Sequence, residues 1–281
     1  MRFDILTIFP GFFSGFLENG ILRRALADKI LEVAVHDLRA FTHDRHRTVD
    51  DRPFGGGEGM VLKPQPIAEA MASLGIEPKD QRAEAQPAPP QVVLLSAQGR
   101  PFTQAVARQL ATLDRIVLIC GRYEGVDERI NQLYCDWELS IGDYVLSGGE
   151  LAASVVIDAT MRLLPGVLGN EASSEFESFG VADAEIDADK EGVPRSQHGA
   201  GGLLDYPHYT RPADFQGLSV PAPLLNGDHR AIRRWRREQQ LRKTLSNRPE
   251  LLLNAALTEE DRKILRSIQQ GHPDSPGRVI A

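Results

Sequence analysis

Cysteine is scarce in this sequence, and long apolar runs are absent. The two cysteines, Cys120 and Cys135, are too far apart for a zinc or redox motif, and their mostly apolar or aromatic neighbours favour buried free thiols. About 18 consecutive apolar residues are needed to cross a membrane as a helix, and no segment reaches that length. The chain begins Met-Arg-Phe-Asp rather than with a basic stretch and an apolar signal run, so we expect a cytoplasmic protein.

Several familiar motifs are also missing. No G-x-G-x-x-G opens a helix after the first apolar run, which disfavours an ordinary dinucleotide-binding fold. The glycine-rich run 55–59 leads to Lys63 without the Gly-Lys-Ser/Thr ending of a phosphate-binding loop. We interpret this run as a flexible loop over a bound substrate, with a plain surface turn as the alternative. His43 and His46 lie in a polar, arginine-containing loop, so we assign no metal ligands.

The alternation of apolar patterns predicts an α/β fold. Strand-length apolar runs at 3–9, 31–35, 92–95 and 116–119 alternate with segments of helical period at 13–26, 67–74, 102–113 and 150–164. Such alternation is typical of a mainly parallel sheet covered by helices. Beyond Leu203 the pattern is helical, at 228–244 and 259–270, which predicts a small all-α C-terminal domain.

The segment between these regions is acidic, contains glycine and has no apolar face, which is typical of a linker. We therefore expect an α/β domain over 1–169, a flexible interdomain linker over 170–202, and a helical domain over 203–281. We expect the part from 180 to 202 to be disordered without substrate.

The local charge of the C-terminal region differs from that of the whole chain. A net charge of −7 argues against indiscriminate nucleic-acid binding. Between 229 and 248, however, Glu238 is the only acid and Trp235 stands in the middle of a basic cluster. This cluster comprises Arg230, Arg233, Arg234, Arg236, Arg237, Arg242, Lys243 and Arg248. The pattern is typical either of a solvated helix face or of a helix that binds RNA phosphates.

Small residues gather in three loops that follow predicted strands or lead into a predicted helix. The loops are 96–99 (SAQG), 121–125 (GRYEG) and 140–150 (SIGDYVLSGGE). Loops at the carboxyl ends of parallel strands open into a shared crevice, and glycine lets the backbone approach a ligand closely. Each loop alone could be a simple turn, but three together indicate a ligand site.

With these loops, the chain resembles the bacterial tRNA (guanine-N1)-methyltransferase family of the SPOUT class almost from end to end. The words that carry the resemblance are FDILTIFP (3–10), DDRPFGGG (50–57), GRYEGVDER (121–129), SIGDYVLSGGE (140–150), PGVLG (165–169), PHYTRP (207–212) and IRRWR (232–236). The resemblance implies a SPOUT-type parallel sheet with a deep trefoil knot, a flexible linker, and a helical domain that binds tRNA. It also implies a homodimer whose active site is shared between the subunits.

The resemblance places S-adenosyl-L-methionine in the knot loops. The residues that match the family's cofactor site are Leu95, Ser96, Gly121, Tyr123, Glu124, Gly125, Ser140, Ile141, Gly142, Asp143, Tyr144, Val145, Leu146, Gly148 and Gly149. The family's first loop reads Ser-Pro-Gln-Gly, whereas this chain has Ala97 in place of the proline. Loss of the ring changes the stiffness of the loop but leaves the backbone contacts possible.

The reaction implied is transfer of the methyl group to N1 of the guanine just 3′ of the anticodon. Because N1 carries a proton and negative charge moves onto O6, the transfer needs a carboxylate base and a cation. By resemblance the cation is Arg162; a helix-end arginine that stabilises the dipole is the alternative. The base is Glu177, where the family has an aspartate before Ser-Phe, and a shifted register would select Glu175 instead.

Further residues match the family's substrate contacts. Asp205 and His208 are expected to order the linker over the guanine, with turn capping as the alternative, and Arg233, Arg234 and Arg236 are expected to contact the tRNA. Mg²⁺ is suspected as a cofactor, without identifiable ligands. We expect the anticodon stem-loop of tRNA as partner, and neither DNA nor a membrane. The alternatives are a SPOUT-type RNA methyltransferase with another target and a non-catalytic RNA-binding homologue.

Overall fold

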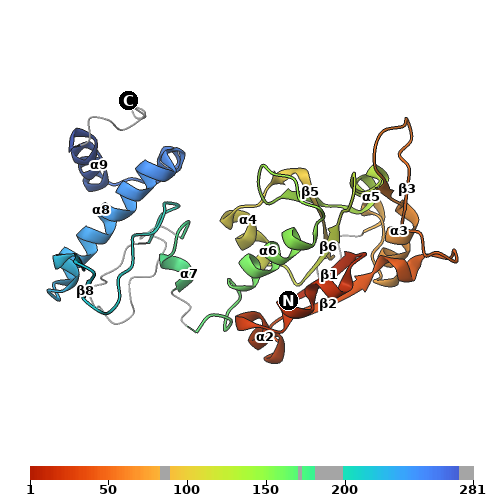
Figure 1. The fold of residues 1–281 in the computed structure, drawn as a ribbon, viewed down its shortest axis with the longest axis horizontal. Coiled ribbons are helices and arrows are strands. Elements are labelled where there is room, and N and C mark those ends of the chain that lie inside the picture. Colours follow the sequence, from red (N-terminus) through yellow and green to blue (C-terminus); the bar gives the residue numbers. More distant parts are fainter. Residues whose placement is uncertain (83–88, 170–172, 181–198, 272–281) are drawn as a thin grey trace. The chain divides into compact units, whose positions relative to one another are not determined.

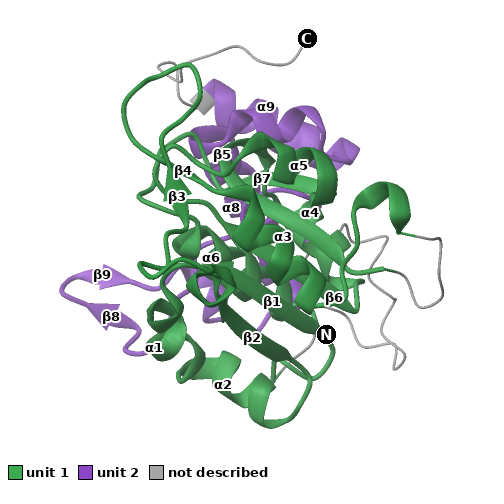
Figure 2. Cartoon of the chain, turned by 90° about the vertical axis from the view of Figure 1, so that its right-hand side faces the viewer, with its two compact units in different colours: residues 1–169 green, residues 170–281 purple. Residues whose placement is uncertain are grey.

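The computed structural model describes residues 1–82, 89–169, 173–180 and 199–271. The chain divides into two compact units, unit 1 over residues 1–169 and unit 2 over residues 170–281, shown in separate colours in Figure 2. Much of the expected linker, at 170–172 and 181–198, lies outside the described residues. Among the described helices, none is long and apolar enough to cross a membrane.

Unit 1 is built on a five-stranded sheet in the order β2-β1-β6-β5-β7 (Figure 1). All neighbouring strands are parallel. The strands are β1 (Arg2–Thr7), β2 (Glu32–Asp37), β5 (Gln91–Pro101), β6 (Arg115–Cys120) and β7 (Trp137–Ser140). The predicted parallel α/β sheet is thereby confirmed. The edge strand β7 was not predicted, because its sequence, WELS, is short and mixes polar with apolar residues.

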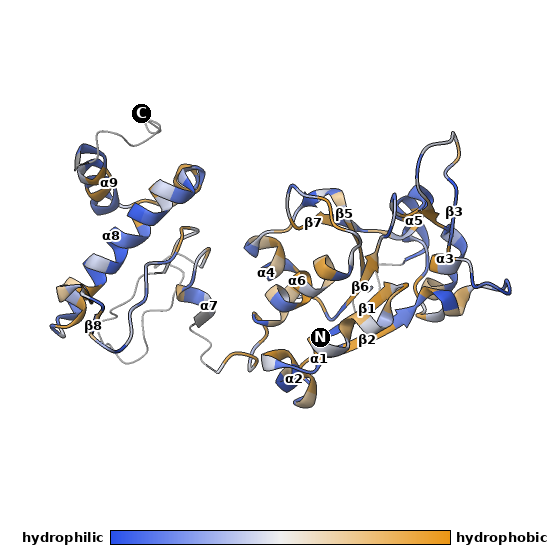
Figure 3. Ribbon diagram, in the orientation of Figure 1, coloured by the Kyte–Doolittle hydropathy of each residue, from blue (hydrophilic) through white to orange (hydrophobic). Residues whose placement is uncertain are grey.

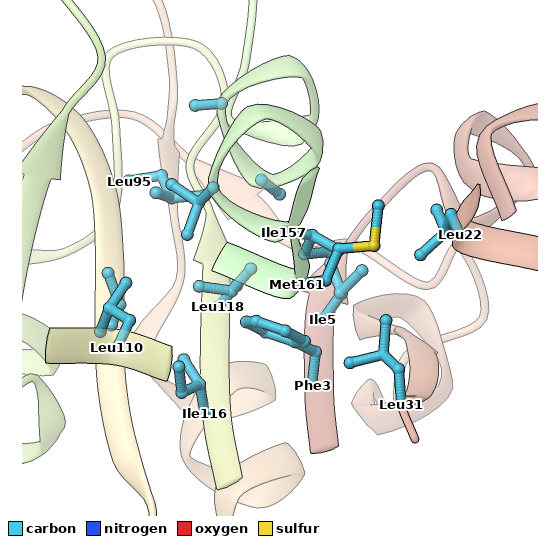
Figure 4. Close-up of a cluster of buried hydrophobic side chains, with 14 of the residues drawn as sticks. Phe3, Ile5, Leu22, Leu31, Leu95, Leu110, Ile116, Leu118, Ile157 and Met161 are labelled. Carbon is cyan, nitrogen blue, oxygen red and sulfur yellow. The ribbon is translucent and has the colours of Figure 1, made fainter. Parts of the chain in front are cut away.

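Alternate residues of each inner strand enter different cores, as expected for strands covered on both faces. In β6, Ile116 and Leu118 belong to one apolar cluster, whereas Val117 and Ile119 belong to another. Close-packed burial of this kind contributes about 1.5–3 kcal/mol for each large side chain. Figure 4 shows the first cluster, where side chains from β1, β5 and β6 meet those of neighbouring helices such as Ile157.

Helices cover both faces of the sheet (Figure 1). The first cluster includes side chains from η1 (Pro10–Phe13), α1 (Ser14–Leu17), α2 (Gly20–Ala27), α4 (Gln104–Ala111) and α6 (Glu150–Met161). The second includes side chains from η2 (Leu38–Phe41), α3 (Pro64–Ser73) and α5 (Glu128–Tyr134). A short antiparallel pair, β3 (Asp50–Asp51) and β4 (Val61–Leu62), flanks the glycine-rich run, and η3 (Lys79–Gln81) follows α3.

Unit 2 is mainly helical. It contains α7 (Ser173–Phe176), η4 (Ala222–Leu224), α8 (His229–Asn247), η5 (Pro249–Leu253) and α9 (Glu259–Gly271). The Asp228 carboxylate caps α8 by accepting hydrogen bonds from the backbone N–H groups of Arg230 and Ala231. The small core of unit 2 comprises Leu203, Leu241, Leu252, Leu265 and Ile268.

The expectation of a wholly helical C-terminal region needs correction, because unit 2 also contains a hairpin of β8 (Asp214–Phe215) and β9 (Leu218–Ser219). The two residues between the strands, Gln216 and Gly217, both have positive φ, of 55° and 83°. This is the conformation that a two-residue hairpin turn requires. The apolar pattern misses the hairpin because Phe215 and Leu218 are exposed and contribute nothing to the core.

A buried carboxylate joins three strands at the start of the sheet. Asp4 in β1 is fully buried and accepts hydrogen bonds from Arg2, His36 and Arg115 at 2.8–3.1 Å. Burial by itself raises the pKa of the Asp4 carboxyl, but the hydrogen bonds from these three partners outweigh it. The net pKa lies below the ordinary value for aspartate, so the charged form stabilises the fold.

We predict that Asp4→Asn lowers the free energy of unfolding by about 1–3 kcal/mol near pH 7, because hydrogen bonds to a buried charged group are lost. A lowered pKa in the folded state gives stability that is complete above the unfolded pKa of about 3.9 and is lost as the pH falls through the folded pKa. The difference between the two proteins should therefore shrink below about pH 4 in urea unfolding experiments. Glu32→Gln is the matched control. It also removes a carboxylate near Arg2, but Glu32 is exposed and its nearest oxygen is 4.0 Å from the Arg2 guanidinium, beyond hydrogen-bond distance. If the difference in unfolding free energy between the wild type and Asp4→Asn stayed the same at acid pH, the stabilising role of the charged Asp4 carboxylate would be contradicted.

Candidate functional site

A cavity of about 310 Å³ lies at the carboxyl ends of β5, β6 and β7. Its walls come from the loops at 95–98, 121–125 and 140–149. Of the residues expected at the cofactor site, all but Asp143 line it; Asp143 is exposed and does not. The three glycine-rich loops predicted from the sequence therefore meet around one space.

The first of these loops interrupts a strand. In β5, Leu95 and Arg100 both pair with Leu139 of β7, so residues 96–99 leave the ladder as a bulge. Gly99 is required there, because a Cβ atom at this position would lie 2.5 Å from the backbone of Glu138 and Leu139. The bulge carries Ser96, Ala97 and Gln98 to the cavity. The alanine that replaces the family's proline is thus part of the cavity wall.

The other two loops are bonded to each other through their backbones. The N–H of Gly149 donates to the carbonyl of Gly121 at 2.9 Å, and Arg122 forms an isolated bridge with Gly148. A Cβ atom at Gly149 would lie 2.7 Å from Cα of Cys120, so only glycine allows this approach. The cavity wall is therefore fixed by the main chain rather than by flexible side chains.

A buried ion pair reinforces this junction. The Arg122 guanidinium lies 2.8 Å from the carboxylate of Glu150, which is 1% exposed. The same carboxylate accepts a hydrogen bond from the Thr7 hydroxyl at 2.7 Å, and Arg122 also donates to the carbonyl of Ser147 at 3.0 Å. The sequence did not reveal this network, because its members are brought together only by the order of the strands.

The glycine-rich run at 55–59 ends beside the cavity. The N–H of Glu124 donates to the carbonyl of Met60, and the N–H of Leu62 donates to the carbonyl of Gly125, each at 3.0 Å. Gly55, Gly56, Gly57 and Gly59 all have φ between 79° and 122°, a region that favours glycine. This placement fits the sequence interpretation of a loop near a bound substrate.

The cavity is acidic. Glu124, Glu128 and Glu138 line it, whereas the single lining arginine, Arg122, is already paired with Glu150. Carboxylates in a partly enclosed space favour a positively charged ligand. S-adenosylmethionine, with a sulfonium and an ammonium group, fits these residues, and the volume lies at the lower end of the roughly 300–1,000 Å³ typical of small-molecule sites.

The two cysteines are free and buried, as predicted. Burial, followed by the nearby charge of Glu150, raises the pKa of the Cys120 thiol well above its ordinary value. Burial raises the pKa of Cys135 to about 12. Both therefore remain protonated thiols and are poor nucleophiles.

Arg162 does not line the cavity. It follows the last residue of α6 and is half-buried, whereas Gly149 and Ala152, at the start of α6, line the cavity. A helix of this length spans about 18 Å at 1.5 Å per residue. Within one chain, the expected O6 donor and the expected cofactor site thus lie at opposite ends of α6.

Glu177 belongs to unit 2 and follows α7 directly. Its carbonyl accepts a hydrogen bond from the N–H of Gly180 at 2.9 Å. The neighbouring Ser178 hydroxyl accepts from the backbone N–H of Asp205 at 2.9 Å, and the Asp205 carboxylate bonds His208 at 2.8 Å. The structure therefore brings Asp205 and His208 to the segment that carries the expected base.

The basic helix α8 is partly neutralised. Arg237 forms a two-point ion pair with Asp261 of α9, at 2.7 and 2.9 Å, and Arg242 pairs with Glu238. The charge count along α8 alone does not reveal the partner of Arg237, which comes from another helix. Of the expected tRNA contacts on α8, Arg234 is exposed and Arg233 and Arg236 are half-buried. Arg236 stacks on the Tyr206 ring at 4.8 Å.

Metal ligands are not grouped in the described part of the chain, where no three His, Cys, Asp or Glu side chains are placed to hold an ion. His43 bonds Glu69 at 2.8 Å.

Comparison with known proteins extends over both units. The family model described as tRNA (Guanine-1)-methyltransferase TrmD matches residues 1–254. A tRNA (guanine-N(1)-)-methyltransferase of Koribacter versatilis is 54% identical over 271 residues, which cover 96% of this chain and 99% of that protein. Proteins of the same name from Heliobacterium modesticaldum and Geobacter metallireducens are 49% and 46% identical, over 94% and 96% of this chain and 89% and 99% of their own lengths. The chain belongs to the tRNA (guanine-1)-methyltransferase family.

Proposed function

We propose that this chain transfers the methyl group of S-adenosylmethionine to N1 of the guanine just 3′ of the anticodon in tRNA. The observation that carries the proposal is the acidic, backbone-walled cavity, formed by the residues expected to hold the cofactor, in a chain whose family match covers both units. We place the activity in the cytoplasm with its tRNA substrate.

The cofactor, when bound, supplies an electrophilic methyl group on a sulfonium. The exposed N–H and C=O groups of loops 121–125 and 140–149 can bind its adenosine without charged side chains. The carboxylate of Glu124 stands at the cavity and can offset the positive charge. Because the loops are fixed to each other, little ordering is needed on binding.

Two side chains carry the proton and charge chemistry in this proposal. The Glu177 carboxylate removes the N1 proton of guanine, and the Arg162 guanidinium donates hydrogen bonds to O6 as negative charge develops there. Asp205 and His208 position the Glu177 segment through Ser178. Arg233, Arg234 and Arg236 hold the tRNA on α8. We assign no residue to Mg²⁺.

The knot and the division of domains are part of the proposal. We infer that loops 121–125 and 140–149 form the trefoil knot, supported by the chain's path: after the edge strand β7 it returns to bond the loop that follows β6 before entering α6. We assign cofactor binding to 1–169, the linker that carries the base to 170–202, and tRNA binding to 203–281.

A homodimer would resolve the position of Arg162. Leu151 and Val155, one turn apart on α6, are 50% and 45% exposed, and Phe9 and Phe12 beside η1 are also exposed. Since η1 contacts α6, we group these four side chains as one apolar face, here named the α6 face; Figure 3 shows the hydrophobic colouring of the α6 ribbon. We propose that a second copy covers it about a two-fold axis.

Two antiparallel α6 helices that cross near Val155 would place Arg162 of one protomer opposite residue 148 of its partner. That position belongs to the cavity. The position of the apolar face and the length of α6 support the shared active site that the family resemblance implies.

We predict that tRNA transcripts with guanine after the anticodon accept labelled methyl from S-adenosylmethionine, whereas transcripts with adenine at that position do not. Only guanine offers the N1–H and O6 pair on which the proposed chemistry acts. A guanine transcript that already carries N1-methylguanine is the control and should accept no label. Equal transfer to the guanine and adenine transcripts would rule out the proposed substrate.

We predict that Glu177→Gln lowers kcat by about 10²- to 10⁴-fold, the usual contribution of a general base. Affinity for S-adenosylmethionine, measured by calorimetry, should not change, because every residue that lines the cavity belongs to unit 1. Glu175→Gln is the matched control and should retain activity. If Glu175→Gln is inactive and Glu177→Gln active, the base is Glu175.

We predict that the double variant Leu151→Glu, Val155→Glu is monomeric in analytical ultracentrifugation and inactive, because four buried carboxylates would face one another across the two-fold axis. Leu133→Glu on α5 is the control, because Leu133 is equally exposed, at 49%, on the other side of the sheet. It should remain dimeric and active. A wild-type protein that sediments as a monomer would overturn the dimer.

A further inference from the structure

Unit 2 contains a second cavity, of about 550 Å³, and among its lining residues the proposed function uses only His208 and Arg236. Its walls are the segment 206–213, residues between 220 and 225, and one face of α8 formed by Ile232, Trp235 and Arg236. Every wall belongs to unit 2, so the cavity is a property of that unit alone.

Flat side chains surround this cavity. Tyr209 is 50% exposed, and its ring lies 6.1 Å from that of Trp235 at an angle of 60°. Tyr206 is buried, with the Arg236 guanidinium 4.8 Å from its ring on one side and the His208 ring at 4.8 Å. Aromatic rings and guanidinium planes are the surfaces on which unstacked bases are held.

The charges at the cavity are of one sign. Arg211 lines it and is exposed, and in the described part of the chain no carboxylate pairs with it. No acidic residue is among those that line the cavity. A cationic, aromatic cavity favours an anionic ligand with a flat ring, which is the chemistry of a nucleotide.

We propose that this cavity receives one unstacked base of the RNA substrate, a nucleotide other than the methylated guanine, with its phosphate near Arg211. The inference rests on the proposed function and deepens it. The methylated guanine needs a carboxylate at N1, and this cavity has none, so the two bases occupy different sites. The cavity gives unit 2 a way to recognise an unpaired loop rather than a duplex.

The first experiment locates the base. Anticodon stem-loop RNAs that carry 2-aminopurine at one loop position at a time are bound to the full-length protein, and the emission of the probe is recorded. At one position other than the methylated guanine, the emission should be quenched by stacking in the wild type. Tyr209→Ala should abolish that quenching, whereas Tyr209→Phe, which keeps the ring, should preserve it.

The second experiment separates stacking from charge. Tyr209→Ala should weaken binding of the unlabelled stem-loop by about 5- to 150-fold. The slope of log Kd against log salt should not change, because the ring releases no counterions. Arg211→Ala should instead reduce the slope by about one, which is the contribution of one phosphate contact. Phe215→Ala is the matched control, because Phe215 is an exposed aromatic of the same unit outside the cavity.

A second variant guards against loss of folding. Leu225→Glu places a negative charge at an exposed residue of the cavity and should also weaken RNA binding. Tyr209→Ala and Leu225→Glu should both keep the thermal unfolding midpoint of the wild type.

The proposal is overturned if no loop position shows quenching that depends on Tyr209 while RNA affinity stays unchanged. It is also overturned if Tyr209→Ala alters only the dissociation of the dimer, since the cavity would then hold protein. A methyl-transfer assay of the same wild-type preparation distinguishes failure of the cavity proposal from failure of the proposed function. Transfer with unchanged binding by Tyr209→Ala rejects only the cavity; absence of transfer rejects the proposed function.

Discussion

The carboxylate of Glu150 is the contact on which the cavity of unit 1 depends. It is buried at the first residue of α6, where it bonds the Thr7 hydroxyl at the end of β1 and pairs with Arg122 in the loop after β6. Three segments far apart in the sequence are therefore held at one point. Removing one partner of such a pair typically costs about 3–5 kcal/mol, because a charge is left buried without compensation.

The cavities of the two units are lined by side chains of opposite charge. The cavity of unit 1 is lined by glutamates, whereas the face of α8 and the aromatic cavity of unit 2 carry arginines. The net charge of −7 therefore describes neither site. A cationic cofactor and an anionic RNA can bind the same chain because each meets a region of opposite charge.

Sequence patterns predicted what depends on local order. Strands β1, β5 and β6 were visible because their apolar side chains enter both clusters, whereas the half-buried edge strand β2 was visible through the apolar run at 31–35. The cavity loops were visible because close backbone approach requires glycine, as at Gly149. The edge strand β7 and the short helix α5 were missed, because only a few of their residues are buried.

What the sequence could not predict depends on distant partners. The pairing of Arg237 with Asp261 and of Arg122 with Glu150 joins residues from different elements, and local charge counts cannot detect either. The separation of Arg162 from the cavity likewise appears only when α6 is seen as a straight rod. The family resemblance implied the role of Arg162, but not its place in the fold.

The length of α6 determines how far Arg162 lies from the cavity of unit 1. Gly149 and Ala152, at its first turn, line the cavity of unit 1, and Arg162 follows its last residue. Inserting or deleting one residue within it would move Arg162 by only about 1.5 Å along the axis but turn it by about 100° around the helix. In the proposed dimer, a change in the length of α6 would therefore turn Arg162 away from the partner's cavity, whereas a substitution on α6 outside the α6 face would leave its direction unchanged.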